Sequence, residues 1–591
     1  MINKNERQLG TIEFVNQQII EFSASFSDLE TKIHNGRFQS VHGINDFIYT
    51  RVNWNTLVLY RITRARNNTF DKNISGNSLG ENDKVIFSAE PVGTLVNDEF
   101  KSGTLTYPMV GTTVFAMDEL LLEDIFSSIG DNLVSLGSIN NYPNLYPKIN
   151  LKKLLTSHVS ILGNTGSGKS TTLRVLADRL NKISDGLSSL AKFFIFDVHG
   201  DYGELKFAKH IPVREMHLPL EKLSVQDWEA ALLPSEKTQK PILNRALQIA
   251  RVSPRGKKII YAILAKKVIR NEASESFVLL KRAVSKWFAL IFESDDEAMK
   301  SLEDWQQKYS DIIGEDKVIN LLEGEIPAAG PHTIEGVINE YTESKMTLDG
   351  LGVSFDIVFG EEEAKGNKRA RMNTETMMGR FRNLESKYGN DGVLSENHGD
   401  ALTLERSTLG AEKFFVLDLT NLDDDALRLV SNYLCRSVFE FNLHFDHTKR
   451  DEMPFNYLYL DEAHRYVREN SESDDSTIFE TIAREGRKFN VYLCVISQIP
   501  SELSKVVLSQ TGAFFIHRIQ NSADLDFIRR NVPSATDHLI LRLSNLPAGT
   551  ALLSGNAFEI PFELVVDAGE YGNVSSSLSP IEGKDSSIEE S

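Results

Sequence analysis

Short runs of β-branched and aromatic residues, separated by turn residues, fill the beginning of the chain. Stretches such as FIYTRV, NTLVLYRITRA and KVIFSAEPVGTLV follow one another with few helical patterns between them. This spacing is typical of the strands of a small barrel or sandwich. We therefore expect residues 1–145 to form an N-terminal β-barrel.

From Leu151 onwards, strand-like runs alternate with helical ones. The apolar run from His158 to Leu162 predicts a strand, and the spacing of apolar residues from Thr171 to Leu180 predicts a helix. A second apolar strand, from Lys192 to Asp197, completes a βαβ unit.

The same alternation returns near the end of the chain. Expected strands are 413–419, 456–461, 491–497 and 513–518, and expected helices are 424–445, 478–488 and 501–510. Strands alternating with helices predict a parallel sheet covered on both faces, and hence an α/β fold. Residues 215–410, between the two halves, are charged and largely helical in pattern, which predicts an insertion or lid subdomain. Residues 569–591 are rich in serine and acidic residues and are expected to be a disordered tail.

Composition limits the class of protein. The chain has 591 residues, of which 41% are hydrophobic and 25% charged, as in globular proteins of several domains. Its net charge of −19 excludes adhesion to nucleic acid through an overall positive field, so a phosphate-bearing partner needs a local basic patch. Two cysteines, Cys435 and Cys494, both in apolar runs, are expected to be buried thiols. Without a signal pattern or an apolar stretch of about 18 residues, a soluble cytoplasmic protein is expected.

The strongest chemical signal lies between the first strand and the helix that follows it. The segment GNTGSGKS matches the P-loop spacing G-x-x-x-x-G-K-[ST]. Its backbone N–H groups would cradle phosphates, Lys169 would reach the β- and γ-phosphates, and the Ser170 hydroxyl would bind Mg²⁺. The alternative is a glycine-rich turn that binds nothing. The expected nucleotide-binding residues are Gly163, Asn164, Thr165, Gly166, Ser167, Gly168, Lys169, Ser170 and Thr171.

Two further strands end in polar residues suited to ATP hydrolysis. Asp461 and Glu462 follow an apolar strand, and we assign Asp461 to the metal and Glu462 to polarising the attacking water. Gln498 ends the next strand and is expected to sense the γ-phosphate, the alternative being an amide bonded to a loop. Asp418 follows another strand and either caps a loop or touches nucleotide. The segment 197–202, after the second strand, is also placed for a ligand site.

A basic segment, IAREGRKFN, lies between the helix after Asp461 and the next strand. We expect Arg484 or Arg487 to reach the nucleotide of a neighbouring subunit as an arginine finger. The alternative is a solvated basic helix end favoured by the helix dipole. Arg518 and the Arg529–Arg530 pair are weaker candidates for the same role.

Taken in order, GNTGSGKS, DVHGDYGEL, YLYLDEAHRYV and REGRKFNVYLCVISQIPSELS resemble the HerA branch of the HerA/FtsK ring ATPases. The resemblance implies a RecA-like P-loop core in two parts, 146–214 and 411–568, preceded by the barrel. It implies a homohexamer that binds ATP and Mg²⁺ between subunits and moves duplex DNA, with the nucleotide roles given above. It also implies a nuclease or NAD-consuming effector docked on the barrel, with a place in antiphage defence.

Three other functions are alternatives to a DNA translocase. The letters DEAH at residues 461–464 suggest the DEAH-box helicases, but too little chain follows for a second RecA-like domain. A ring platform that gathers and switches an effector stays open as an alternative, whereas a secretion ATPase is disfavoured because no segment offers membrane attachment. The basic stretch around Lys365, Lys368, Arg369 and Arg371 is either a DNA contact of the translocase or a solvated loop.

Overall fold

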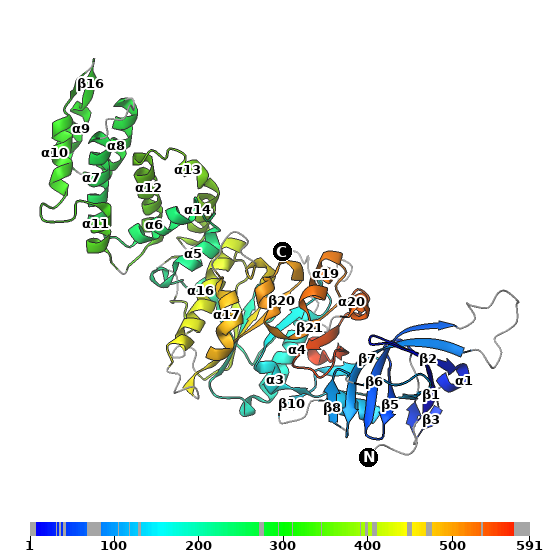
Figure 1. Ribbon diagram of the computed structural model, residues 1–591. Helices are drawn as coiled ribbons and strands as arrows, with labels where there is room; N and C mark the ends of the chain where they lie inside the picture. Colours follow the sequence, from blue (N-terminus) through cyan, green and yellow to red (C-terminus); the bar gives the residue numbers. More distant parts are fainter. Residues whose placement is uncertain are drawn as a thin grey trace, which may run out of the picture.

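The computed structural model describes residues 7–572 except 31, 35–36, 40–42, 68–83, 98, 105, 118, 128–131, 271–276, 294, 310, 344, 391, 396–399, 405–410, 446–451, 469–475 and 534–535. A β-barrel lies at one end of the molecule, an α/β layer in the middle and a long helical arm at the other end (Figure 1). The expected tail, 569–591, lies largely outside the described residues, apart from a 3-10 turn at Gly569–Tyr571.

Six strands close into the N-terminal barrel. Their spatial order is β2-β1-β9-β5-β6-β7, and the pairing of β2 with β7 completes the ring, while β8 adds to the free side of β7. Side chains such as Phe22, Val58 and Tyr60 fill the barrel core. The strands are β1 (Gln8–Val15), β2 (Ile20–Ser25), β5 (Phe47–Asn53), β6 (Thr56–Asn67), β7 (Lys84–Val96), β8 (Glu99–Ser102) and β9 (Thr113–Ala116).

A ten-stranded sheet forms the central layer, in the order β11-β23-β22-β21-β13-β20-β19-β14-β18-β15. The strands from β21 to β15 are parallel, and β22, β23 and β11 add an antiparallel edge. The parallel strands are β13 (His158–Leu162), β14 (Ala191–Asp197), β15 (Lys209–Pro212), β18 (Phe414–Asp418), β19 (Phe455–Leu460), β20 (Val491–Ser497) and β21 (Thr511–Ile516). The antiparallel ones are β11 (Gly137–Ile139), β22 (Thr550–Gly555) and β23 (Phe562–Val566).

Helices cover both faces of this sheet. Along β14, Phe193 and Ile195 pack into one core together with α4 (Lys169–Lys182), whereas Phe194 and Phe196 pack into the other. The second core holds α16 (Asp424–Leu443) and α17 (Ile478–Glu485). A strand buried on both faces explains the continuous apolar runs of the sequence. The remaining helices here are α3 (Leu151–Leu155), α18 (Lys505–Ser509), α19 (Ser522–Asn531) and α20 (Asp537–Leu543).

The helical arm, residues 225–388, projects from the α/β layer on the side away from the barrel (Figure 1). Its base is tied to the layer by a buried ion pair between Asp227 of α5 and Arg436 of α16, with 2.6 Å between Oδ2 and NH2. Asn432 also donates to Asp227, at 2.7 Å. The arm consists of α5 (Val225–Leu232), α6 (Lys240–Ala250), α7 (Pro254–Arg270), α8 (Phe277–Ile291), α9 (Asp296–Asp304), α10 (Glu315–Glu325), α11 (Ile334–Tyr341), α12 (Leu348–Ala364), α13 (Ala370–Asn373) and α14 (Glu375–Tyr388).

The predicted fold class is confirmed, and several details differ from expectation. Residues 137–139, expected within the barrel, form β11 of the central sheet, because their backbone pairs with β23. The helix expected over 501–510 begins only at Lys505, after a 3-10 turn at Pro500–Glu502. The arm contains an unforeseen hairpin of β16 (Gln306–Lys308) and β17 (Asp311–Ile313). Both cysteines are free and buried, as predicted.

Candidate nucleotide site

The P-loop joins β13 to α4 at the carboxyl edge of the parallel sheet. Gly163 and Gly168 have φ angles of 152° and 114°, a region of backbone conformation that side chains disfavour. A Cβ at Gly163 would lie 2.5 Å from Cβ of His517, so the loop also needs glycine for space. Gly168 caps the N-terminus of α4, which therefore points its positive dipole into the loop.

Lys169 is buried at the start of α4. Its Nζ donates to the backbone oxygen of Asn164 at 3.0 Å, inside the P-loop. Burial lowers the pKa of Lys169, while the nearby acids Glu462 and Asp461 act in the opposite direction. A buried ammonium in a ring of N–H groups favours an anion in this loop.

Asp461 and Glu462 follow β19, two strands away from the P-loop strand. Glu462 has a left-handed backbone, with φ at 46°, and its N–H donates to Asp461 Oδ1 at 3.0 Å. Burial and the Glu462 charge raise the pKa of Asp461 to about 7. Burial also acts to raise the pKa of Glu462, but hydrogen bonds from His199 and Gln498 outweigh it and lower that pKa.

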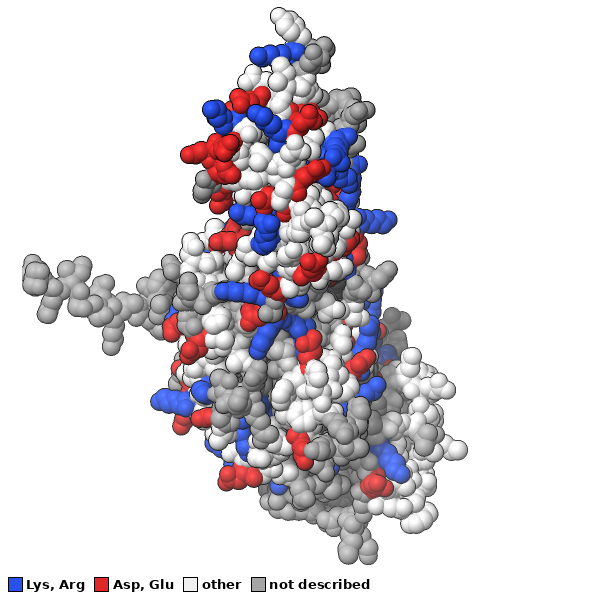
Figure 2. Space-filling model, turned by 90° about the vertical axis from the view of Figure 1, so that its left-hand side faces the viewer, with Lys and Arg blue, Asp and Glu red and all other residues white. Residues whose placement is uncertain are grey.

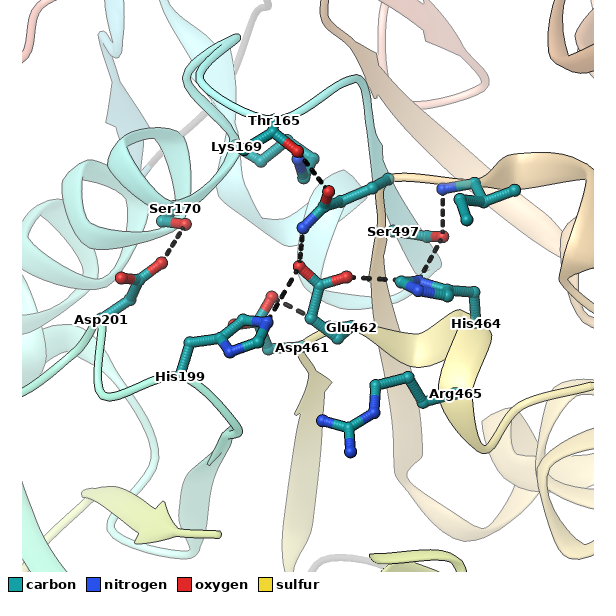
Figure 3. Close-up of polar contacts among 12 residues, drawn as sticks. Thr165, Lys169, Ser170, His199, Asp201, Asp461, Glu462, His464, Arg465 and Ser497 are labelled. Atoms are coloured by element: carbon teal, nitrogen blue, oxygen red, sulfur yellow. Dashed lines mark hydrogen bonds and ion pairs between the residues drawn. The ribbon is translucent and has the colours of Figure 1, made fainter. Parts of the chain in front are cut away.

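A chain of side-chain contacts links the P-loop to Glu462 (Figure 3). Thr165 Oγ1 donates to Gln498 Oε1, and Gln498 Nε2 donates to Glu462 Oε1. Gln498 follows β20, the strand between the P-loop strand and β19, so it bridges the two. The structure therefore brings together three residues that the sequence placed on separate segments.

Two histidines lie on opposite sides of the Glu462 carboxylate (Figure 3). His199 Nε2 is 3.6 Å from Oε1, and His464 Nδ1 is 3.2 Å from Oε2. The contact with Glu462 raises the pKa of His199, whereas burial lowers the pKa of His464.

Asp201 is the acid that contacts the P-loop serine. Ser170 Oγ donates to Asp201 Oδ2 at 2.8 Å, and Arg174 of α4 donates to the Asp201 backbone oxygen at 2.8 Å. The sequence placed the segment 197–202 near the site, but it did not single out Asp201. Asp418, the other strand-end acid, accepts from the backbone N–H of Thr420 at 3.0 Å and so caps its own loop.

The donor set fits a divalent cation held jointly with phosphate. No group of three or more His, Cys, Asp or Glu side chains among the described residues could hold a metal ion by itself. Magnesium in nucleotide sites characteristically takes one or two carboxylates or hydroxyls, with water and phosphate completing its shell. Burial and the Glu462 charge raise the pKa of Asp461, and a bound cation would favour its ionised form.

His517 is a residue of the site that sequence reasoning missed. It is completely buried beneath the P-loop, where Nε2 lies 2.9 Å from the Thr172 hydroxyl, and its backbone N–H donates to Leu162 at 2.7 Å. Burial, together with the Lys169 charge, lowers its pKa to about 4. Its position directly after β21 was the available signal, since β21 neighbours the P-loop strand.

The two candidate finger arginines lie away from this edge. Arg484 lies in the last turn of α17, and Arg487 lies in the 3-10 turn Gly486–Phe489, which leads into the amino end of β20. Gln498 follows the carboxyl end of the same strand, about 20 Å away for a strand of this length. Both arginines are exposed, and Arg484 donates to Ser476 at 2.7 Å. Within one subunit, the structure therefore does not bring them to the P-loop.

These observations define a P-loop ATPase with a RecA-like parallel sheet. The sequence profile described as "Helicase HerA, central domain" matches residues 134–438, and the chain belongs to this family. The resemblance noted from the motifs is thereby confirmed, and the chain is an ATPase.

Curated relatives match over most of the chain. It is 23% identical to the DNA double-strand break repair helicase HerA of Pyrococcus furiosus, over 93% of this chain and 91% of that protein. It is 24% identical to the protein of the same name from Saccharolobus solfataricus, over 78% of this chain and 74% of that protein. Among solved structures, VirB4 of Thermoanaerobacter pseudethanolicus aligns with a TM-score of 0.39 and 15% identity, over 75% of this chain and 99% of that one.

In the part of the chain that the structure describes, no helix is both long and apolar enough to cross a bilayer.

Proposed function

We propose that this ATPase is a motor that hydrolyses Mg²⁺–ATP between the subunits of a homohexamer and moves duplex DNA. The observation that carries the catalytic part is the contact chain from Thr165 through Gln498 to Glu462. It joins the loop that would bind phosphate to the carboxylate that would activate water. The repair-helicase names of the relatives support DNA as the track.

The P-loop residues would hold the nucleotide. The N–H groups of the P-loop and the buried Lys169 would bind the phosphates, and Ser170 with Asp461 would hold Mg²⁺. The N–H groups of Gly163 and Asn164 already donate to the backbone oxygens of Ser497 and Arg518, at 3.2 and 2.9 Å. When bound, the ion supplies positive charge that offsets the charge of the phosphates. Ser170 donates to Asp201, so Asp201 is a further carboxylate that would lie near an ion held by Ser170.

Glu462 would act as the general base and Gln498 as the sensor. The pKa of Glu462 is lowered despite burial, so the carboxylate is ionised at neutral pH and able to accept a proton from water. Gln498 contacts both the P-loop and Glu462, so its amide is placed to respond when a γ-phosphate enters.

The ring is supported by the position of the basic segment. Since Arg484 and Arg487 lie at the amino edge of β20 and are exposed, they could act as fingers only on the nucleotide of an adjacent subunit. Each site would then be incomplete without a neighbour, as closed cyclic symmetry allows.

A mixing experiment tests this arrangement. The variant Glu462→Gln and the double variant Arg484→Ala/Arg487→Ala are each expected to hydrolyse ATP poorly alone. Mixed rings would form some sites from the intact glutamate of one subunit and the intact arginines of the next, so activity should recover. Lack of recovery in rings shown by mass measurement to be mixed would contradict a finger in trans.

The DNA track has its own test. ATP turnover should rise with duplex DNA and fall as salt increases, because phosphate contacts release counterions. Turnover indifferent to DNA in a hexamer of measured mass would contradict the motor. The effector, a nuclease or NAD-consuming enzyme docked on the N-terminal barrel in an antiphage role, is part of this proposal, and co-purification with and without residues 1–145 tests the docking.

One observation favours a second candidate, an ATP-switched ring platform for the effector. Two residues of the basic stretch considered for DNA contact are paired with acids: Lys365 Nζ lies 3.0 Å from Glu362, and Arg371 contacts Glu363 and Asp356, each at 3.0 Å. Figure 2 shows basic and acidic side chains interspersed along the arm on the face in view. Turnover that depends on the effector but not on DNA would support the platform.

A further inference from the structure

The carboxylate of Glu462 is held by side chains from three different segments. Gln498 donates to Oε1 from the end of β20, His464 contacts Oε2 from its own 3-10 turn at Ala463–Arg465, and His199 contacts Oε1 from the loop after β14. Only 5% of the Glu462 side chain is exposed, so little room remains for it to move unless one of these contacts is released.

The three contacts are not equivalent. Gln498 is also bonded to Thr165 of the P-loop, so a phosphate that enters the loop competes for the same amide. His464 is only two residues from Glu462 and belongs to the same turn, and its Nδ1 also lies 3.4 Å from the Ser497 hydroxyl. His199, by contrast, lies in the loop after β14, a segment separate from both.

Hydrogen bonds to Asp197 hold the backbone of the loop that carries His199. Asp197 Oδ1 accepts from the N–H groups of Gly200 and Asp201, at 2.7 and 3.1 Å, and Oδ2 accepts from Tyr202 at 3.2 Å. Because β14 lies directly beside β19 in the sheet, this loop holds the imidazole next to Glu462. The His199 side chain is 52% exposed, so packing of the core does not require it there.

We propose that His199 is a positioning residue for Glu462: it keeps the carboxylate in place while the Gln498 amide exchanges Glu462 for the nucleotide. The inference rests on the proposed role of Glu462 as the base. His199 itself touches neither nucleotide nor water in this scheme. It acts through Glu462, whose orientation determines how well it aligns with the attacking water.

Steady-state ATP hydrolysis separates this role from a structural one. His199→Ala should lower kcat by about tenfold, because a misplaced base loses alignment, while the KM for ATP stays within about twofold. His199→Gln, whose amide can still donate to a carboxylate, should recover at least about half of the lost activity. Binding of a fluorescent ATP analogue should be the same in all three proteins.

His210→Ala is the matched control, because His210 is exposed on β15 at the far edge of the sheet. It should leave kcat and KM unchanged. Wild-type turnover by His199→Ala would overturn the inference, as would equal losses in the alanine and glutamine variants with a raised KM.

Glu462→Gln, measured alongside, distinguishes this inference from the proposed function. If Glu462→Gln retains turnover, the assignment of the base fails and His199 has nothing to position. If Glu462→Gln is inactive while His199→Ala is normal, only the inference about His199 fails.

Discussion

The nucleotide site and the helical arm both contain many charged residues, but they arrange them differently. At the site, Lys169 is buried against a loop carbonyl, and burial together with the Glu462 charge raises the pKa of Asp461 to about 7. In the arm, opposite charges meet directly, as between Arg245 and Glu361, where Nε and Oε2 are 3.1 Å apart. Buried charges without full compensation are typical of ligand sites, whereas the charges of the arm are compensated by ion pairs, most of which are exposed.

Basic residues of the arm, unlike Lys169 at the nucleotide site, are paired directly with acidic side chains. Lys266 and Arg270 of the arm both contact Glu323, at 2.7 and 2.9 Å, so their two positive charges are partly offset within the arm. A count of basic residues in the sequence therefore overstates the positive surface that the arm offers to DNA phosphates. The five predictions below test this contrast, from the largest expected effect to the smallest.

Replacing the proposed base should have the largest effect. Glu462→Gln removes the proton acceptor but keeps the shape of the side chain, so kcat should fall by about a thousandfold while ATP still binds. Steady-state ATP hydrolysis should show this fall in kcat, and a nucleotide-binding assay should show unchanged affinity. Gln510→Ala, on the exposed end of α18, is the control, and strong turnover by Glu462→Gln would refute its role.

Removing the buried ion pair between the arm and the α/β layer should have the second-largest effect, a loss of stability. Asp227→Ala leaves the Arg436 guanidinium buried without its main partner, which should cost about 3 kcal/mol of stability. Denaturant unfolding measures this loss. Asp356→Ala removes two exposed ion pairs in the arm, with Arg371 and Lys286, and serves as the control. Equal stability of the two variants would show that the buried pair does not anchor the arm.

Removing the buried ammonium should weaken nucleotide binding directly. Lys169→Ala is expected to reduce ATP affinity by about a hundredfold, since a charged hydrogen bond to phosphate is lost. Titration with a fluorescent nucleotide checks it. Lys182→Ala, at the other end of α4, where Lys182 pairs with Asp178 at 2.7 Å, should bind normally.

Lowering the pH should destabilise the protein through His517. Its pKa is about 4 in the fold because of burial and the Lys169 charge, against an ordinary value of 6.5. Below pH 6.5 the unfolded chain takes up a proton that the folded chain does not, so stability falls as the pH decreases toward 4. Relative to neutral pH, this proton uptake lowers the free energy of unfolding by about 2 kcal/mol near pH 5. His517→Asn should show a shallower decline between pH 7 and 5, whereas an unchanged slope would contradict this source.

The smallest effect is expected in the arm. Lys365 is 51% exposed and already paired with Glu361 and Glu362, so Lys365→Ala should change stability by less than about 0.5 kcal/mol. It should also leave DNA-stimulated turnover within about twofold. A large loss of DNA-stimulated turnover would show that Lys365 leaves its ion pairs with Glu361 and Glu362 and contacts DNA.

Much of the central layer could be predicted from the sequence. The strands at 158–162 and 491–497 begin and end where the apolar runs do, because strands buried on both faces leave no alternation to misread. The antiparallel edge of β22, β23 and β11 was not foreseen, since its short strands find partners only through contacts distant in sequence.

The site was predicted in composition but not in its contacts. The P-loop and the acids after β19 are local motifs, readable from spacing alone. The order of strands in the sheet decides two of these contacts. It places Asp201, and not Asp461, against Ser170, and it places His517 beneath the P-loop.

By itself, the sequence determined that this chain has a P-loop, an acidic pair after an apolar strand and alternating strands and helices, because each depends on neighbours within a few residues. Only the tertiary structure decided that Thr165, Gln498 and Glu462 form one chain of contacts and that His199 lies against the same carboxylate. These residues are far apart in sequence, and the parallel order of β13, β20, β19 and β14 alone brings their strand ends to one edge.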